Sequence, residues 1–474
     1  MACRKSRSHF YAAFSEDTGI ALAAVVIVSA ILFVIVTTLL GLVAYRTSQT
    51  EHYVDRAKAM QVADAGVSEY LYQVGRNFNY ADTVPRLPAT GAAAMPDGST
   101  WSVETTRATV AGVPNQLVLS ATGTLPNGYS RKVKMVVRFP TLADYALLVN
   151  ASQPIGVGAV FNGKFHCNGD CSNAGVIMGD ASATGRFTWP GTKSDHFKAG
   201  VYDQNPNLEV KFSDILQDIA NMKTKAISTS TYYNLSGTSY GYNAVINGSQ
   251  LTVYKITAIN GIAARTTADH TAHTFTPYPD PVLGTLTKTL VGTINLPGDA
   301  VVFFDDDVWI SGSYACALTI ATGAGKDIYL YDNVSLTAPN SNYTLGLVSS
   351  RNVVFPYWSD LMPASTTIQA AVLAQSGTLV AEAYPGSGTS SLQEWYWKTT
   401  SPAGWTLQTR TAAKKTAVTF NGSVGMSGSS GLSAGFDSRV FNYDNRLLTM
   451  PPPMYPRDAS KAPSIGLWNE SGGG

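Results

Sequence analysis

Charged residues are scarce in this chain. Lysine, arginine, aspartate and glutamate make up 14% of its 474 residues, against roughly 25% in an average soluble domain. The 33 basic and 32 acidic residues almost cancel, so there is no general basic field of the kind that draws a protein onto nucleic acid. We therefore expect no nucleic-acid partner and a surface covered mainly by neutral polar side chains.

Cysteine is also scarce, since four residues are too few for a disulfide-built scaffold. Cys3 precedes the one long apolar run of the sequence, whereas Cys167, Cys171 and Cys316 follow it. In an oxidising compartment Cys167 and Cys171, in the segment HCNGDC, could close a small local disulfide. A pair of free thiols in a turn is the alternative.

Familiar catalytic signatures are missing as well. The sequence contains no G-x-S-x-G, no H-E-x-x-H, no P-loop and no dinucleotide fingerprint. We expect neither enzymatic activity nor a cofactor, although an enzyme can distribute its catalytic residues across a fold. The enzyme alternative is a membrane-anchored β-helix protein that acts on a polysaccharide.

Three consecutive carboxylates, Asp305, Asp306 and Asp307, are the candidate catalytic groups for that alternative. Neighbouring residues of a strand face opposite sides, so the three cannot all converge on one scissile bond. We interpret them as a turn between two strands.

Two clusters contain residue types that bind metals, and neither has the spacing of a standard site. The first lies in TADHTAHTF and the second in HCNGDC; they comprise Asp269, His270 and His273, and His166, Cys167, Asp170 and Cys171. We expect a surface loop for the first and a disulfide or free thiols for the second, and no metal in either.

An aromatic triplet, Trp395, Tyr396 and Trp397, could form a stacking platform for sugars. In a strand the two tryptophans share one face, and burial of that face is the favoured interpretation.

The most informative stretch is the apolar run from Ile20 to Ala44, which is 25 residues long and carries no charge. At 1.5 Å per helical residue it can cross a hydrocarbon layer of roughly 30 Å, and it is too long for the core of a secretory signal peptide. Arg4, Lys5 and Arg7 precede it, which favours a cytoplasmic N-terminus and an exported C-terminal region. We predict a single-pass protein of the cytoplasmic membrane.

Helical periodicity continues beyond this run. Apolar positions recur at spacings of three and four, at Tyr53, Ala57, Met60, Ala63, Val67, Leu71 and Val74. No proline occurs before Pro85, so one helix from Ile20 to about Arg76 would be on the order of 80 Å long. Its apolar face requires a partner.

The short basic leader, Gly19 before the apolar run, and AKAMQVADAGVSEYL resemble the N-terminal domain of PilX-type minor pilins. Ala63, Asp64, Ala65 and Gly66 match the A-E-A-G step of that family. The resemblance implies cleavage by a prepilin peptidase between Gly19 and Ile20, with the mature helix packing against other pilins in a filament. It implies pilins, the peptidase and the lipid bilayer as partners, with surface glycans or cell receptors as further candidates.

One position departs from the pattern of pilins. They usually carry glutamate at the fifth mature residue, and that position here is Ala24. A plain membrane anchor that is never cleaved, in a passive envelope protein, is the alternative.

The exported region is predicted to be mainly β. Residues 77–144 comprise a linker and a three-stranded antiparallel meander, formed by STWSVETTRATV, NQLVLSATGTL and SRKVKMVVRF. Residues 145–456 contain short strands separated by turns rich in Gly, Asn and Asp, which predict a parallel β-helix or solenoid; β-sandwich domains are the alternative. One helix is expected near 211–227 and a flexible tail over 457–474.

The fold class expected is therefore mainly β with a long N-terminal helix, and the parts are the leader 1–19, the helix 20–76, the meander and the solenoid. The function expected is that of a minor-pilin-like surface protein in type IV pilus assembly or adhesion. It would be inserted in the membrane before assembly and then be displayed on the pilus or the cell surface.

Overall fold

The computed structural model describes residues 14–76, 80, 84–110, 113–138, 140–212, 215–238, 240–260, 266–269, 274–277, 285–338, 343–356, 363–381, 392–398, 404–410, 415–448, 450–458 and 464–471. The chain divides into two compact units. Unit 1 consists of Met1–Thr106, Leu117–Val136 and Ile465–Gly474, and unit 2 consists of Arg107–Gln116 and Val137–Ser464.

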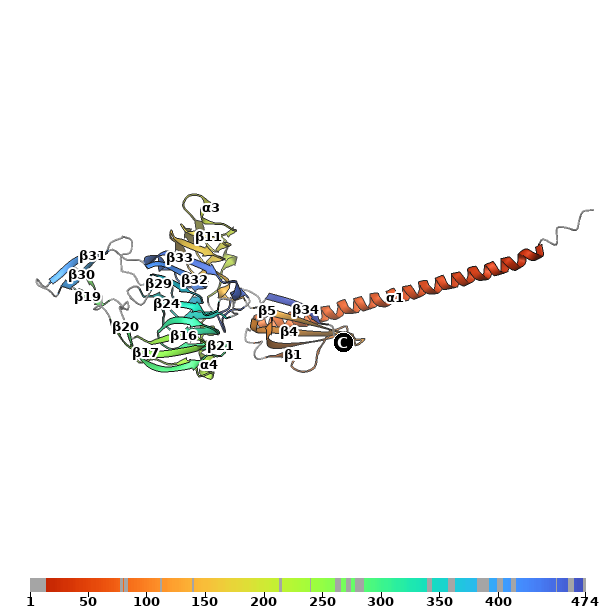
Figure 1. Ribbon diagram of the computed structural model, residues 1–474, viewed down its shortest axis with the longest axis horizontal. Helices are drawn as coiled ribbons and strands as arrows, with labels where there is room; N and C mark the ends of the chain where they lie inside the picture. Colours follow the sequence, from red (N-terminus) through yellow and green to blue (C-terminus); the bar gives the residue numbers. More distant parts are fainter. Residues whose placement is uncertain are drawn as a thin grey trace, which may run out of the picture. The chain divides into compact units, whose positions relative to one another are not determined.

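Unit 1 is built on one continuous helix, α1, which spans Phe14–Arg76 and is drawn in red in Figure 1. Helix formation over 63 residues follows from a segment without proline that is rich in Ala, Leu, Val and Ile. Strands follow the helix along the chain: β1 (Arg86–Leu87), β2 (Ala93–Ala94), β3 (Thr100–Val110), β4 (Val113–Thr124) and β5 (Ser130–Arg138). Their sheet has the order β1-β3-β4-β5-β34, and β2 pairs with β3.

The sheet of unit 1 packs on the second half of α1, and its backbone approaches the helix very closely. A Cβ atom added to Gly123 on β4 would lie 2.2 Å from the carbonyl oxygen of Ala59 and 2.5 Å from the nitrogen of Ala63. Only a glycine on the strand and alanines on the helix permit this distance. Ala59 and Val62 of the helix are buried in one cluster with Leu125, and Trp101 of β3 packs against it.

The C-terminal end of the chain adds the last strand to this sheet. The sequence predicts a flexible tail over 457–474, but residues Ser464–Ser471 form β34, which pairs with β5. The alternation of Ile465 and Leu467 in SIGLWNES is the signal of a strand, and the neighbouring Pro and Gly residues obscured it. β5 is therefore an inner strand of the sheet rather than its edge.

Unit 2 is a stack of short strands joined by corners. Its elements are η1 (Leu142–Asp144), β6 (Leu147–Val149), β7 (Gln153–Ile155), β8 (Ala159–Asn162), β9 (Phe165–Cys167), β10 (Cys171–Asn173), β11 (Val176–Ile177), β12 (Ala181–Ala183), β13 (Phe187–Thr188), α3 (Lys193–His196), β14 (Val201–Tyr202), η2 (Pro206–Leu208), α4 (Ile215–Ser228), β15 (Tyr232–Tyr233), β16 (Tyr242–Gly248), β17 (Gln250–Asn260), β18 (Thr266–Asp269), β19 (Thr274–Pro277), β20 (Thr285–Asn295), β21 (Asp299–Phe304), β22 (Val308–Tyr314), β23 (Ala317–Thr322), β24 (Ile328–Leu336), β25 (Leu345–Ser349), β26 (Val353–Phe355), β27 (Ser365–Ile368), β28 (Ala371–Ala374), β29 (Leu379–Ala381), β30 (Leu392–Lys398), β31 (Gly404–Arg410), β32 (Lys415–Met426), η3 (Leu432–Ala434), β33 (Phe436–Tyr443) and η4 (Asn445–Leu448).

Strands of successive turns of the chain pair in parallel, which is the hydrogen-bond pattern of a solenoid. On the first face β21 pairs with β23, β23 with β25, and β25 with β28. On the second face β16 pairs with β22, β22 with β24, and β24 with β26 and β27. The parallel register confirms the solenoid, and it excludes a β-sandwich for these rungs.

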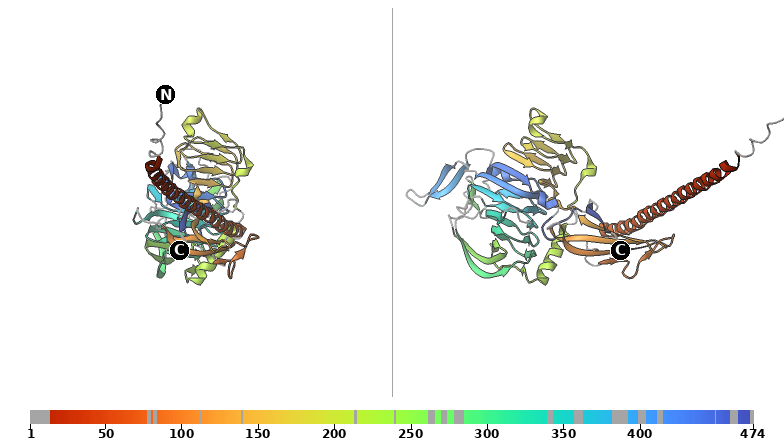
Figure 2. Two further views of the ribbon diagram at one scale, coloured as in Figure 1. Left: turned by 90° about the vertical axis from the view of Figure 1, so that its right-hand side faces the viewer. Right: turned by 45° about the vertical axis from the view of Figure 1, so that its right-hand side comes forward.

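The order of rungs in the stack differs from their order in the sequence. β6 pairs with the second half of β32, and β8 pairs with β33, so the first rung of unit 2 lies directly on the last one. Figure 2 shows the yellow and orange strands of the first rungs beside the blue strands of the last rungs. We call this junction the seam.

Side chains on both sides of the sheet hold the seam together. Inside the solenoid the ring of Phe161 stacks on that of Phe441 with a centroid distance of 4.6 Å. On the outside the Asn162 amide donates to Asn442 Oδ1 at 2.7 Å, across 280 residues of sequence. The buried guanidinium of Arg439 donates to the carbonyl oxygen of Val157 at 2.5 Å.

Helix α4 covers the outer side of the first face. Its Ile219, Met222 and Ala226 are buried in one cluster with Val301 and Phe303 of β21. The helix overlaps the segment near 211–227 for which the sequence predicts one. The observed fold is mainly β with a long N-terminal helix, as expected from the sequence.

The close approach of β4 to α1 can be tested by Gly123→Ala. The new methyl group would meet helix backbone that cannot move aside, so we expect the free energy of unfolding of unit 1 to fall by about 1–3 kcal/mol. Thermal unfolding of the full chain in detergent measures this. Gly292→Ala on β20 is the matched control, because nothing lies within 4 Å of its added Cβ atom; equal effects of the two substitutions would contradict the account.

Candidate functional site

The two halves of α1 have different surroundings within the chain. The helix contains one segment that is long and apolar enough to cross a membrane, and no part of the most apolar window is buried. Leu22, Phe33 and Leu40 expose 68%, 70% and 63% of their surface. By contrast Ala59, Ala63, Tyr70 and Val74 near the other end are fully buried.

Polar side chains in the apolar half are satisfied by the helix itself. The hydroxyl group of Thr37 donates to the carbonyl oxygen of Phe33 at 2.8 Å, and that of Thr38 donates to Val34. Such bonds let a threonine enter hydrocarbon without an unpaired donor. The exposed apolar surface of residues 22–43 therefore suits a lipid or helical environment.

Gly66 and Ala63 of the family-like step face the sheet of their own unit. A Cβ atom on Gly66 would come within 2.8 Å of the Trp101 ring on β3, while Asp64 points away and is exposed. The sequence predicts that this face of the helix requires a partner, and the partner within the chain is the meander. Tyr53, which the periodicity places on the same face, is 67% exposed.

The predicted cleavage residues, Gly19 and Ile20, lie within α1, in its N-terminal part whose side chains are not described. Ala24 is exposed on the helix. Cleavage between Gly19 and Ile20 stays a prediction.

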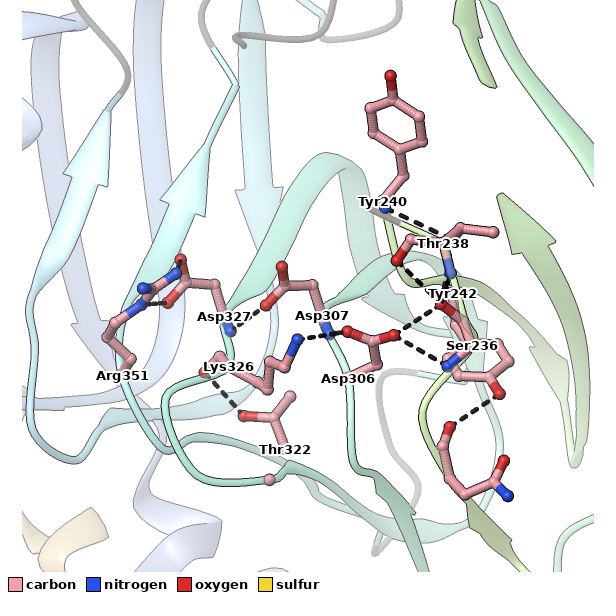
Figure 3. A network of polar contacts seen from close by, with 12 residues as sticks. Ser236, Thr238, Tyr240, Tyr242, Asp306, Asp307, Thr322, Lys326, Asp327 and Arg351 are labelled. Carbon is pink, nitrogen blue, oxygen red and sulfur yellow. Dashed lines mark hydrogen bonds and ion pairs between the residues drawn. The ribbon is translucent and has the colours of Figure 1, made fainter. Parts of the chain in front are cut away.

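The carboxylates of Asp305, Asp306 and Asp307 lie at the corner between β21 and β22 and bind different partners. Asp305 pairs with Lys223 of α4 at 2.6 Å and accepts a hydrogen bond from the Tyr232 hydroxyl. Asp306 and Asp307 belong to the network in Figure 3. The three groups do not share one substrate-sized site.

Asp306 is the best-connected of the three (Figure 3). Its Oδ2 accepts from the nitrogen and hydroxyl of Ser236 at 3.0 and 2.6 Å. Its Oδ1 accepts from Lys326 Nζ at 2.6 Å. The side chain is almost fully buried, and a buried carboxylate with this many donors is stabilised as an anion.

A ladder of side-chain to backbone hydrogen bonds links equivalent corners of successive rungs. Asp307 Oδ1 accepts from the nitrogen of Asp327 at 2.8 Å, and Asp327 Oδ1 accepts from that of Asn352 at 2.8 Å. Asn352 Oδ1 then accepts from the nitrogen of Thr378 at 3.0 Å. Each acidic or amide side chain thus satisfies a corner nitrogen that the strand ladder leaves unpaired.

Positive side chains form ion pairs with carboxylates of these corners, as Arg351 does with Asp327 (Figure 3). The guanidinium donates to both carboxylate oxygens at 2.7 and 2.6 Å, a bidentate geometry. Lys326, Asp327, Arg351 and Ser236 were not identified from the sequence. The recurrence of Asp and Asn at corners was the available signal, but it does not say which cation lies next to which corner.

Two neighbouring carboxylates have opposite pKa shifts. Burial works to raise the pKa of Asp306, but the hydrogen bonds from Lys326, Ser236 and the Asp307 backbone outweigh it, so the pKa lies below its usual value. Burial raises the pKa of Asp307. The hydrogen bond that Asp307 accepts from the Asp327 backbone and the nearby positive charge of Lys326 lower this pKa by less than burial raises it.

Side chains of the second candidate cluster form hydrogen bonds to other protein groups. His166 lies between the Ser182 hydroxyl and Asn168 Oδ1, each at 2.8 Å, and Asp170 Oδ1 accepts from the Arg186 nitrogen. Within the ranges that the structure describes, no group of three or more His, Cys, Asp or Glu residues could hold a metal ion.

Other candidates fall wholly or partly outside the described residues. His270 and His273 lie outside them, and of Asp269 only the backbone, in β18, is described. The aromatic triplet lies in β30, which pairs antiparallel with β31, and the side chains of Trp395, Tyr396 and Trp397 are outside the description.

Comparisons with known proteins leave the family open. No protein-family model matches the sequence, and no curated protein is significantly similar to it. The crystal structure of the competence-associated pilin ComZ from Thermus thermophilus aligns with a TM-score of 0.29 and 12% identity, over 88% of this chain and 97% of that chain. An ice-binding protein from the Antarctic ascomycete Antarctomyces psychrotrophicus aligns with a TM-score of 0.23 and 10% identity, over 65% of this chain and 99% of that chain. At these TM-scores neither structure enters the argument below.

The opposite pKa shifts predict opposite effects of two isosteric substitutions. A carboxyl group whose pKa is lower in the folded chain than in the unfolded chain stabilises the fold at pH values above its unfolded pKa, and this stabilisation is lost as the pH falls through its folded pKa. A carboxyl group whose pKa is raised by folding destabilises the fold at pH values above its folded pKa, and this penalty disappears as the pH falls. At pH 7 Asp306→Asn should therefore lower the free energy of unfolding by about 1–3 kcal/mol, and Asp307→Asn should raise it by up to about 1 kcal/mol.

Thermal unfolding of both variants between pH 7 and the carboxyl titration range measures these differences. The benefit of Asp307→Asn should vanish as pH falls to about 4, because the native carboxyl is then protonated too. A loss of stability at pH 7 in both variants would contradict the assignment.

Proposed function

We propose that this chain is a minor-pilin-like subunit, and that unit 2 is a non-catalytic surface module for filament assembly or adhesion. The observation that carries the proposal is the division of α1 into a bare apolar half and a half covered by its own sheet. Residues 22–43 lie in the cytoplasmic membrane before assembly. They then pack with helices of other pilins.

The dimensions of the bare half support this proposal. Twenty-two residues at 1.5 Å each extend about 33 Å, which matches the roughly 30 Å of hydrocarbon in a bilayer. Tyr45 and Arg46 follow directly and are exposed, as side chains at a membrane boundary commonly are. The helix continues without a break from this half to the half that the sheet of unit 1 covers.

A plain anchor would not need such a helix. A flexible linker after residue 44 would display unit 2 equally well, whereas here α1 continues for almost three turns of exposed helix before Asp55 accepts a hydrogen bond from Asn127 at 2.8 Å. A stiff connection between the membrane and the sheet of unit 1 suits a subunit that must occupy a defined place beside other subunits of a filament. Unit 2, exported by this topology, would present its neutral polar surface to glycans or cell receptors.

Cleavage by a prepilin peptidase between Gly19 and Ile20 belongs to this proposal. Mass spectrometry of the mature N-terminus in the native host tests it. We expect the mature chain to begin at Ile20, and we expect Gly19→Leu to keep the leader. Gly41→Leu, at a position with nothing within 4 Å of an added Cβ atom, should be cleaved normally.

Two outcomes would overturn the proposal. A chain that retains Met1 in the mature envelope fraction would show an uncleaved anchor. Cleavage at a site well after residue 20 would remove the apolar half that must enter the filament.

A further inference from the structure

Two buried cysteines flank one corner of the solenoid. Cys167 ends β9 and Cys171 begins β10, and both side chains are fully buried. Only Asn168, Gly169 and Asp170 separate them. Their thiols are not bonded to each other in the structure.

The two thiols have unequal surroundings. The Cys171 thiol donates a hydrogen bond to the Cys167 sulfur, which lowers the pKa of Cys167 and raises that of Cys171. Cys167 also lies 3.2 Å from the carbonyl oxygen of Gly169. The two thiols are therefore neighbours in the folded corner, and the thiolate of either cysteine is the form that reacts.

The corner between the cysteines is enclosed by the rungs on either side. The Asn168 amide donates to Asn150 Oδ1 at 2.7 Å and to the carbonyl oxygen of Val210 at 2.6 Å. A Cβ atom on Gly169 would lie 2.7 Å from the nitrogen of Ser152. These contacts hold the backbone in the tight turn that brings the two thiols together, and neither cysteine has exposed surface.

A third buried thiol provides an internal comparison. Cys316 precedes β23, and burial raises its pKa to about 11. No other cysteine of the described region forms a bond with it. It should stay a thiol wherever the chain resides.

We propose that Cys167 and Cys171 form a disulfide once unit 2 leaves the cytoplasm, and that the bond locks this corner before the neighbouring rungs close over it. The thiolate of one cysteine attacks the disulfide of an oxidised thiol compound or protein, and one thiolate leaves. The thiolate of the other cysteine then attacks the sulfur of the first in the mixed disulfide, and the second thiolate leaves. The carrier gains the two electrons, and the two protons of the cysteines pass to its thiols.

The order of events follows from the burial of the corner. Because both thiols are fully buried in the folded corner, an oxidant or reductant cannot reach them there. Thiol–disulfide exchange must therefore take place before the neighbouring rungs around Ser152 and Arg186 pack over the corner. Once formed, the bond should resist reductants in the folded protein. A disulfide across three residues constrains the unfolded chain less than a long loop would, so its main effect is to fix the turn early.

Alkylation of the full chain, exported to its native membrane and denatured without reductant, tests the proposal. We expect Cys316 to be alkylated and the peptide with Cys167 and Cys171 to be unmodified and lighter by two hydrogen atoms. The same chain retained in a reducing cytosol should be alkylated at Cys167, Cys171 and Cys316 alike. Exposure of the folded exported protein to dithiothreitol before denaturation should leave the bond intact.

Cys171→Ser serves as the matched variant, because it should leave Cys167 free for alkylation. Alkylation of both Cys167 and Cys171 in the exported native chain would overturn the proposal, whether or not the variant folds. This outcome is independent of the mature N-terminus, so it separates the disulfide from the proposed pilin function.

Discussion

The exposed apolar surface of residues 22–43 is the constraint on which the rest of the account depends. A helix that exposes this surface is unfavourable in water on its own, because hydration of its apolar side chains costs free energy. Within the described part of the chain nothing covers it. This half of the helix therefore suits lipid or the company of other helices, whereas the buried residues of α1 begin at Ala59.

Both units are completed by segments that come late in the sequence. The sheet of unit 1 gains its last strand from Ser464–Ser471. The first rungs of unit 2 stack on β32 and β33 across the seam. Such long-range contacts form slowly because a long loop must close first. Neither unit can therefore reach its final structure until nearly the whole chain has been synthesised.

Within unit 2, side chains at the corners form hydrogen bonds with backbone nitrogens that the strands leave unpaired. Short strands leave backbone nitrogens unpaired at each turn, and buried unpaired nitrogens are costly. The ladder from Asp307 to Thr378 satisfies them with side chains one rung apart. The acidic triplet is thus explained by architecture: Lys223 pairs with Asp305, Lys326 pairs with Asp306, and Asp307 accepts a hydrogen bond from the Asp327 nitrogen.

The sequence allowed the helix, the meander and the solenoid to be predicted, because each has a period that its residues display. Ala63 and Gly66 were recognisable as a motif, but their contact with Trp101 and Gly123 was not, since periodicity does not identify the strand that will approach. The seam and β34 were missed for the same reason: a short strand carries little information about its neighbour. Asp305 to Asp307 were correctly expected at a turn, whereas Lys326 and Arg351 are brought to them only by the stacking of rungs.

Accessibility of single cysteines introduced along α1 tests the central claim most directly. Val28→Cys, Ser48→Cys and Val67→Cys would be made in the full chain in native membranes and mapped by mass spectrometry after treatment with a water-soluble maleimide. The account predicts that Cys at position 48 is labelled, whereas position 28 is protected by lipid or other helices and position 67 by the sheet until the protein is denatured. Labelling at position 28 as fast as at position 48 would contradict it.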